Sequence, residues 1–219
     1  MSESSLYLRQ MELGPMENFV YLIGDPLTHR AIVVDPAWQV DTILKTANAD
    51  DMQIVGALIS HHHYDHTNGI EDLLNATDCK VYVHKNDAEF VDVKAPNLVK
   101  TSQGDEIKVG NLVIKFMHTP GHTPGSQCFH VQNHLVSGDT LFIKGCGRCD
   151  LPGGDPEQMY YTLTQKLMRM DDDTILLPGH NYAEKPQSTL GDEKKENPYL
   201  KTASGSLKDF LNLRMGKRM

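Results

Sequence analysis

Short apolar runs separated by turn residues dominate the first third of the chain and predict β-strands. The strands expected from this pattern are Leu6–Leu13, Asn18–Gly24, Arg30–Val34 and Ile54–Ile59. Gly14-Pro15 and Asp35-Pro36 supply turn residues at the ends of these runs. Apolar residues at helical spacing predict a helix at Val40–Ala47.

The rest of the chain alternates irregularly between the two patterns. Helices are expected at Asn68–Leu74, Asn86–Phe90, Pro156–Met170 and Ser206–Leu213. Strands are expected at Lys80–His84, Glu106–Val109, Asn111–Met117, Gln127–Val131, His134–Ser137 and Thr174–Leu177. Asp155 is the expected N-cap of the longest helix, because Pro156 then takes the first helical position. Hairpins and crossovers are both implied, so we expect a mixed sheet covered by helices on both sides.

The composition is typical of a soluble globular protein. The 219 residues are 39% hydrophobic and 23% charged, and no apolar run is long enough to cross a bilayer. The polar segment Met1–Gln10 lacks the pattern of a secretory signal, and four cysteines are too few for a disulfide framework. A cytoplasmic location is therefore expected. The net charge of −8 weighs against nucleic-acid binding, and the expected partner is a small molecule.

A cluster of histidines directly follows the predicted strand Ile54–Ile59, in the order His61-His62-His63-Tyr64-Asp65-His66. Alternation along an extended chain puts His61 and His63 on one side and His62 on the other. Asp65 and His66 come where the chain turns into the next helix, so they can face a neighbouring point. One short loop could thus supply ligands to two metal ions.

Three later strand ends carry complementary groups: His122, Asp139 and His180. Each of them directly follows a glycine, which we expect to take a positive φ in a tight turn. Five imidazoles and two carboxylates are ligands that two borderline divalent metals favour. A solvated histidine-rich loop, the alternative for the first cluster alone, does not account for the three matching strand ends.

The order of these seven residues resembles the signature of the metallo-β-lactamase superfamily, over roughly Asn18 to Tyr182. The resemblance implies a four-layer αββα sandwich of mixed α/β class, with the site at one edge between the two sheets. It also implies a catalytic domain at residues 1–190. Residues 191–219 would be a short tail of the same domain with one helix.

The same resemblance implies a dinuclear metal site. His61, His63 and His122 would hold one metal, and the other would be held by Asp65, His66 and His180, with Asp139 as the bridge. Zinc is the expected metal, with iron or manganese as alternatives. A hydroxide bound between the cations would attack a carbonyl carbon. The residues expected to carry catalysis are His61, His63, Asp65 and Asp139.

Other polar residues are expected around this site or away from it. Asp35, at a strand end, is a candidate for a hydrogen bond to a metal ligand, and His84 and His118 are candidates for such a bond or for packing. The remaining histidines are expected to face away or to lie at the surface: His62, His29, His130 and His134. Cys146 and Cys149 lack a second pair that would complete a zinc site, so their segment is expected to be a loop lining the site.

Gly138–Phe142, Gly145–Arg148 and Pro178–Tyr182 resemble the glyoxalase II group, which hydrolyses glutathione thioesters. By that resemblance Arg148 and Tyr182 would hold the glutathione part, because an anionic tripeptide needs a cation and a hydrogen-bonding phenol. The alternative for Arg148 is an ion pair with Asp150 or Asp155 that braces its own loop. After His180 the chain departs from this group, which carries a longer helical extension.

A second resemblance leads to another class of reaction. Gly145–Asp150, together with Ser188–Glu193 and Asn197-Pro198, resembles persulfide dioxygenases, which use a single iron. His61, His122 and Asp139 would then form the facial triad. Both groups share the seven ligand positions, so the motif does not choose between them. A thioester hydrolase is the favoured function, and a lactonase or another ester hydrolase is a further alternative.

Overall fold

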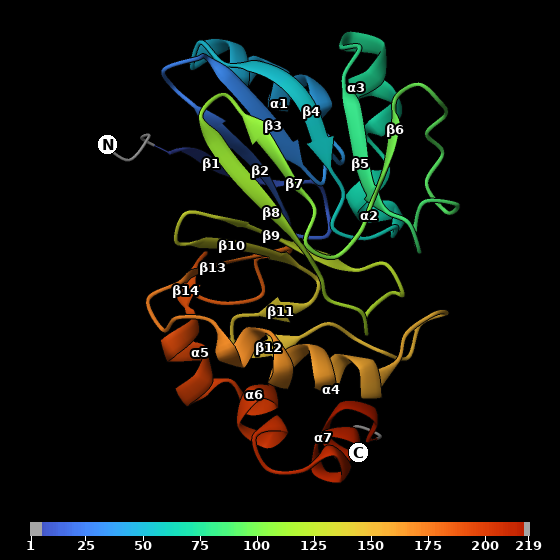
Figure 1. Ribbon diagram of the computed structural model, residues 1–219, viewed down its shortest axis with the longest axis vertical. Helices are drawn as coiled ribbons and strands as arrows, with labels where there is room; N and C mark the ends of the chain where they lie inside the picture. The colour runs from blue at the N-terminus through green and yellow to red at the C-terminus, as the bar shows by residue number, and fades with distance from the viewer. Residues whose placement is uncertain (1–5, 217–219) are drawn as a thin grey trace.

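Two six-stranded β-sheets form the middle of the molecule (Figure 1). They are seen in a computed structural model, which describes residues 6–216; the two ends of the expected domain, residues 1–5 and 217–219, lie outside it. The first sheet contains β1 (Tyr7–Leu13), β2 (Asn18–Asp25), β3 (Arg30–Val34), β4 (Gln53–Leu58), β5 (Lys80–His84) and β6 (Leu98–Thr101), in that order. Its first three strands are antiparallel, and β3 to β6 are parallel.

The second sheet has the order β14-β13-β10-β9-β8-β7. Its strands are β7 (Glu106–Val109), β8 (Leu112–His118), β9 (Gln127–Val131), β10 (His134–Gly138), β13 (Ile175–Pro178) and β14 (Ser188–Thr189). Only β10 and β13 pair in parallel, so their carboxyl ends meet at one edge. Beside that edge lies a small hairpin of β11 (Leu141–Phe142) and β12 (Gly145–Cys146).

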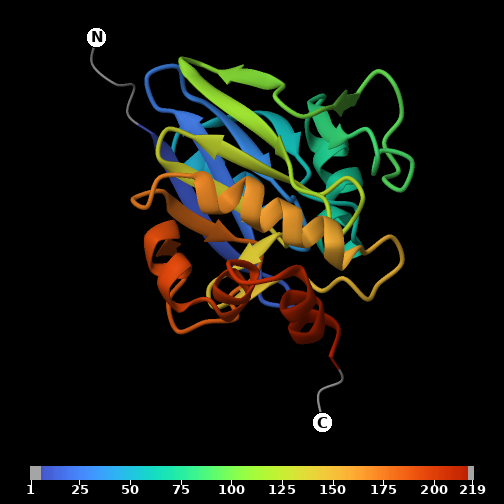
Figure 2. The ribbon, with the colours of Figure 1, turned by 60° about the horizontal axis from the view of Figure 1, so that its bottom comes forward.

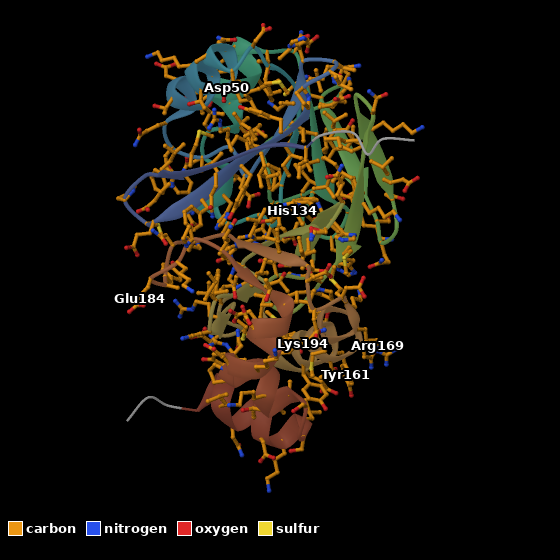
Figure 3. The ribbon with its side chains drawn as sticks, turned by 90° about the vertical axis from the view of Figure 1, so that its left-hand side faces the viewer. Asp50, His134, Tyr161, Arg169, Glu184 and Lys194 are labelled. Carbon is orange, nitrogen blue, oxygen red and sulfur yellow. The ribbon has the colours of Figure 1, made fainter. Side chains whose placement is uncertain are left out.

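Helices cover the outer face of each sheet. The first sheet is covered by α1 (Val40–Ala49) and α3 (Ile70–Ala76), and the one-turn α2 (Tyr64–Thr67) precedes α3. The second is covered by α4 (Pro156–Gln165), the 3-10 helix η1 (Leu167–Arg169), α5 (Leu190–Glu196), α6 (Pro198–Ala203) and α7 (Leu207–Met215). Figure 2 shows α4 lying across the second sheet with α5 to α7 beside it. The side view in Figure 3 separates the helical layers: Asp50 ends α1 at one pole, and Tyr161 of α4 lies toward the other.

Side chains alternate between the two faces of each buried strand and so build three cores. On β2, Val20 and Leu22 pack under α1 and α3, whereas Tyr21 and Ile23 pack between the sheets. On β13, Leu177 lies between the sheets and Leu176 packs under the second group of helices. The expected four-layer αββα sandwich is confirmed. The single mixed sheet with helices on both sides, expected from the pattern alone, is wrong, because the strands of residues 6–216 form two six-stranded sheets and each has helices on one face only.

Several expected elements differ from the structure. Asn86–Phe90 is a run of turns and a bend, so the helix predicted there is wrong. The physical reason is Asp87, whose carboxylate accepts hydrogen bonds from Gly125 N and Thr123 Oγ1 and ties the segment to another loop. The long predicted helix Pro156–Met170 ends earlier, at Gln165, and continues only as a 3-10 turn.

The sequence pattern did not predict β6, the short strands β11, β12 and β14, or the helices α2, α5 and α6. For α5 and α6, however, the sequence contains N-cap residues that could have indicated them. Thr189 accepts a hydrogen bond from Asp192 N, and Asn197 accepts one from Tyr199 N just before Pro198 at the first helical position. The segment after His180 is so polar that these N-caps were not recognised as the starts of helices.

Candidate metal centre

The seven candidate ligands lie where strands of both sheets end. His61 and His63 follow β4, while Asp65 and His66 lie in α2. From the second sheet come the other three, each just beyond β8, β10 or β13: His122, Asp139 and His180. Residues up to 119 positions apart in the chain thus meet at one edge of the sandwich.

The donor atoms of these residues form overlapping groups, within each of which they lie no more than 4.8 Å apart: His61 with His63 and His122, Asp65 with His66 and His180, and His61 with His66 and Asp139. Oδ1 of Asp139 lies 3.4 Å from Nε2 of both His66 and His180, and its Oδ2 lies 3.6 Å from Nε2 of His122. Asp139 therefore stands between the first two groups, where a bridging carboxylate would be required.

Acceptors outside the cluster hold one nitrogen of several rings as an N–H. His122 Nδ1 lies 2.7 Å from the carbonyl of Arg148, and His180 Nδ1 lies 2.8 Å from the carbonyl of Met16. A carbonyl oxygen can only accept, so both Nδ1 atoms donate, and in the neutral rings both Nε2 atoms present lone pairs inward. Nε2 of His180 then faces Nε2 of His66 at 3.2 Å.

Asp35 orients two further rings, His66 directly and His61 through Ser60, so that their Nδ1 atoms also donate. Its Oδ2 lies 2.9 Å from His66 Nδ1 and accepts a 2.6 Å hydrogen bond from the Ser60 hydroxyl. Since Ser60 Oγ donates to Asp35, it accepts from His61 Nδ1 at 3.0 Å. Nε2 of His61 is then a lone pair, buried and without a hydrogen-bond partner. Inward lone pairs on fixed imidazoles are what divalent cations bind, so these residues fit a metal site.

Burial and mutual proximity set the charges of the cluster. Burial, with the neighbouring His66 and His122, lowers the pKa of His61 well below its usual range, which keeps this ring neutral. Burial opposes ionisation of Asp139, but the nearby His66 and His180 hold the pKa of its carboxyl at about 2. A neutral imidazole beside an ionised carboxylate is the protonation state that metal binding needs.

Two of the three glycines before ligands have the expected conformation. Gly121 has φ 140° and Gly138 has φ 49°. Gly179 does not have a positive φ, so the expectation is wrong there. Glycine is needed at that position for close approach instead, because a Cβ would lie 2.5 Å from Oδ1 of Asp139.

The two residues expected to bind substrate are placed differently. The ring of Tyr182 stacks on that of His180, with centroids 4.6 Å apart, and burial raises the pKa of its phenol to about 12. Arg148 contributes its carbonyl to His122, but its side chain is 55% exposed, and its guanidinium forms two 2.9 Å hydrogen bonds with Asp150. Tyr182 therefore lies beside the cluster, and the Arg148 side chain is paired within its own loop.

Cys146 and Cys149 are free thiols buried in the core under α4. The loop between them lies against the cluster through Gly147, where a Cβ would fall 3.1 Å from Cβ of His122. Its backbone lines the centre, as expected, and its sulfur atoms pack in the core.

Three polar residues near the centre were not singled out from the sequence: Asp87, Asn18 and Ser60. Asp87, fully buried, lies 2.9 Å from Nδ1 of His62 and accepts from His62 N, so it holds the histidine loop. His62 itself belongs to none of the donor groups found among residues 6–216. Asn18 donates to the carboxylate of Asp65 at 3.0 Å. The position of Ser60, directly before His61, was a readable signal; Asn18 and Asp87 had none.

Comparisons with known proteins agree with this geometry. The sequence profile described as Metallo-beta-lactamase superfamily matches residues 13–180. A probable polyketide biosynthesis zinc-dependent hydrolase of Bacillus velezensis is 31% identical over 200 residues, which cover 91% of this chain and 88% of that protein. A probable hydroxyacylglutathione hydrolase of Schizosaccharomyces pombe is 34% identical over 226 residues, with coverages of 85% and 84%.

Among solved structures, that of ETHE1 from Myxococcus xanthus has a TM-score of 0.88 at 30% identity, covering 97% of this chain and 92% of that one. A separate observation concerns membranes: among residues 6–216, no helix has both the length and the apolar character that a membrane span requires. The profile match spans all seven clustered residues and the relatives cover most of the chain, so the protein belongs to the metallo-beta-lactamase superfamily.

Proposed function

We propose that this protein is a thioester hydrolase that uses two divalent metal ions, with zinc as the first choice. The observation that carries the proposal is the arrangement of seven donors in two groups with Asp139 between them. The names of two relatives, a zinc-dependent hydrolase and a hydroxyacylglutathione hydrolase, support it. The four free cysteines fit a reducing cytoplasm, which we propose as its location.

Two divalent cations would supply a strong nucleophile from water at neutral pH and stabilise negative charge on a carbonyl oxygen. The chain's own part is to hold the donors in a fixed arrangement. Asp35 orients His66 directly and His61 through Ser60, so one carboxylate serves both groups. Asp139 stays ionised at neutral pH because the pKa of its carboxyl is about 2.

The proposed substrate is a thioester with an anionic thiol part, of which a glutathione conjugate is the example. Tyr182 is already beside the cluster, stacked on His180. The guanidinium of Arg148 would exchange Asp150 for a substrate carboxylate. That exchange costs little, because exposed ion pairs contribute only about 0–1 kcal/mol.

Arg148→Ala tests this substrate class. We expect kcat/KM for a glutathione thioester to fall roughly ten- to a hundredfold, mainly through KM, because one charge-assisted contact is lost. A small neutral thioester should be hydrolysed at the wild-type rate. Arg169→Ala is the matched control: it removes the same charge from an exposed position in η1, outside the cluster of seven residues; Figure 3 labels this residue.

Equal losses on the charged and the neutral thioester would contradict the role of Arg148. Absence of thioester turnover by the metal-loaded wild type would contradict the hydrolase proposal itself.

A further inference from the structure

The side chain of Asn18 connects the turn between β1 and β2 to Asp65. Asn18 is 1% exposed, and its amide nitrogen donates to the carbonyl oxygen and to Oδ2 of Asp65, both at 3.0 Å. The same Oδ2 lies 3.4 Å from Nε2 of His66 and from Nε2 of His180. Asn18 therefore holds the carboxylate oxygen that faces the other two donors of its group.

The indole of Trp38 fixes the orientation of that amide. Its Nε1–H donates to Asn18 Oδ1 at 2.9 Å. If the amide were reversed, its NH₂ group would meet the indole N–H and its oxygen would meet two acceptors on Asp65. Only one orientation satisfies every partner.

The indole is itself held in place. Trp38 N donates to Asn68 Oδ1 at 2.6 Å, and Trp38 has a positive φ of 62°. Gly14 lies directly under the ring, because a Cβ at that position would fall 2.3 Å from the indole Cγ. The indole and the exposed ring of Tyr64 are arranged edge to face, with centroids 6.1 Å apart.

The backbone of the same turn holds His180. The carbonyl of Met16 accepts from His180 Nδ1, and hydrogen bonds of 2.8 Å join Phe19 N to Gly179 O and Asn181 N to Glu17 O. Within the described part of the chain, residues 14–18 make no hydrogen bond to the other donor group, that of His61, His63 and His122. Residues 14–18 thus make hydrogen bonds to two of the three donors of one group and to none of the other.

We propose that Asn18 and Trp38 are positioning residues that hold Asp65 for metal binding in the Asp65–His66–His180 group. This inference rests on the proposed two-metal site. Trp38 is also the single tryptophan of the chain, so its emission should report on that group. A cation at Asp65 would draw charge from the carboxylate to which Asn18 donates and would thereby change the polarity at the indole N–H.

The test is a titration of the metal-free protein with Zn²⁺, followed by Trp38 emission and by the zinc retained after gel filtration. In the wild type, emission should change as one of two zinc ions binds. Asn18→Ala should weaken that ion by about tenfold or more and leave the other unchanged, since loss of a residue that orients a ligand typically costs ten- to a hundredfold in affinity. Trp38→Phe, which keeps a ring and removes the N–H, should weaken the same ion by a smaller factor, read from zinc content.

Asn97→Ala is the matched control. Asn97 Nδ2 donates to the carboxylate of Asp78 at 3.1 Å and to the carbonyl of Cys79 at 2.8 Å, the same pair of acceptor types, far from the metal centre. This variant should bind zinc as the wild type does. Unfolding of each metal-free variant measures any loss of folding separately, and Trp38→Phe carries the test if Asn18→Ala does not fold.

Unchanged zinc affinity in Asn18→Ala and Trp38→Phe, or equal weakening of both ions, would overturn the proposal. Failure of the proposed hydrolase activity shows separately, as absence of thioester turnover in the zinc-loaded wild type.

Discussion

Each histidine of the centre can bind a metal cation only through a ring nitrogen that carries no proton. Carbonyl or carboxylate acceptors lie at the outer nitrogens of His66, His122 and His180, so in the neutral rings the inner nitrogens carry the lone pairs that a metal can bind. The structure brings together all seven residues that the sequence pattern indicated, because they lie in the loops and the short helix that follow recognisable strand ends. The sequence pattern could not indicate Asn18, which reaches Asp65 across 47 positions of the chain and stands in no motif.

The substitution Asp139→Ala should lower the metal content of the protein more than His180→Ala does. Asp139 lies within 3.4–3.6 Å of donor nitrogens in both groups, whereas His180 belongs to one. We expect about one metal per chain to be lost from His180→Ala and about two from Asp139→Ala at the same free-metal concentration. Elemental analysis after dialysis measures this. His134→Ala, on β10, is the control, and full metal content in Asp139→Ala would contradict the bridging position.

Among the elements, the segment from β14 to α6 holds a loop in place. Glu193 is 2% exposed, and its Oε2 accepts from Lys144 N at 2.7 Å and from Asn197 Nδ2 at 3.0 Å. Asn197 also donates to the carbonyls of Phe142 and Gly145. The residues that resemble persulfide dioxygenases in this part of the chain thus brace the hairpin of β11 and β12, which follows Asp139.

Replacement of Glu193 by Ala should therefore destabilise the fold. Two hydrogen bonds to a buried carboxylate are lost, and Lys144 N loses its acceptor, so the free energy of unfolding should fall by about 1–3 kcal/mol. Glu196→Ala is the matched control. Glu196 is 60% exposed and pairs with the side chain of Lys144 at 3.2 Å, so its loss should cost less than about 1 kcal/mol. Urea unfolding compares the two, and equal costs would be inconsistent with the bracing role.

At the scale of the whole molecule, strand patterns predicted much of both sheets but not how the sheets face each other. Residues on both faces of β2 are buried, so the pattern of this strand carries no sign of which face meets the second sheet. The layered arrangement came from the resemblance of the metal motif instead. For the same reason the sequence could not predict contacts between the sheets. One example is His84 on β5, whose ring stacks on that of His118 on β8 with centroids 3.9 Å apart.

That histidine pair should make stability depend on pH. Burial and the neighbouring His118 lower the pKa of His84 from 6.5 to about 4; Lys85 and Lys166 act in the same direction, and Asp87 opposes them. Between pH 6.5 and 4 the unfolded chain takes up a proton at His84 that the folded protein does not. Stability should therefore fall as pH decreases through this window.

Denaturant unfolding of metal-free protein at pH 7 and pH 4.5 measures the effect. His84→Asn should lose less stability over this range than the wild type. An identical loss in both proteins would show that His84 does not contribute.

The most direct test of the account is the number and identity of metal ions in the purified protein, measured by elemental analysis with anomalous scattering. The account predicts close to two divalent ions per chain, zinc first, one at His61, His63 and His122 and the other at Asp65, His66 and His180, with Asp139 between them. Activity should disappear with a chelator and return with the metal. A single iron, with no ion at Asp65, His66 and His180, would contradict the dinuclear hydrolase and favour a mononuclear dioxygenase.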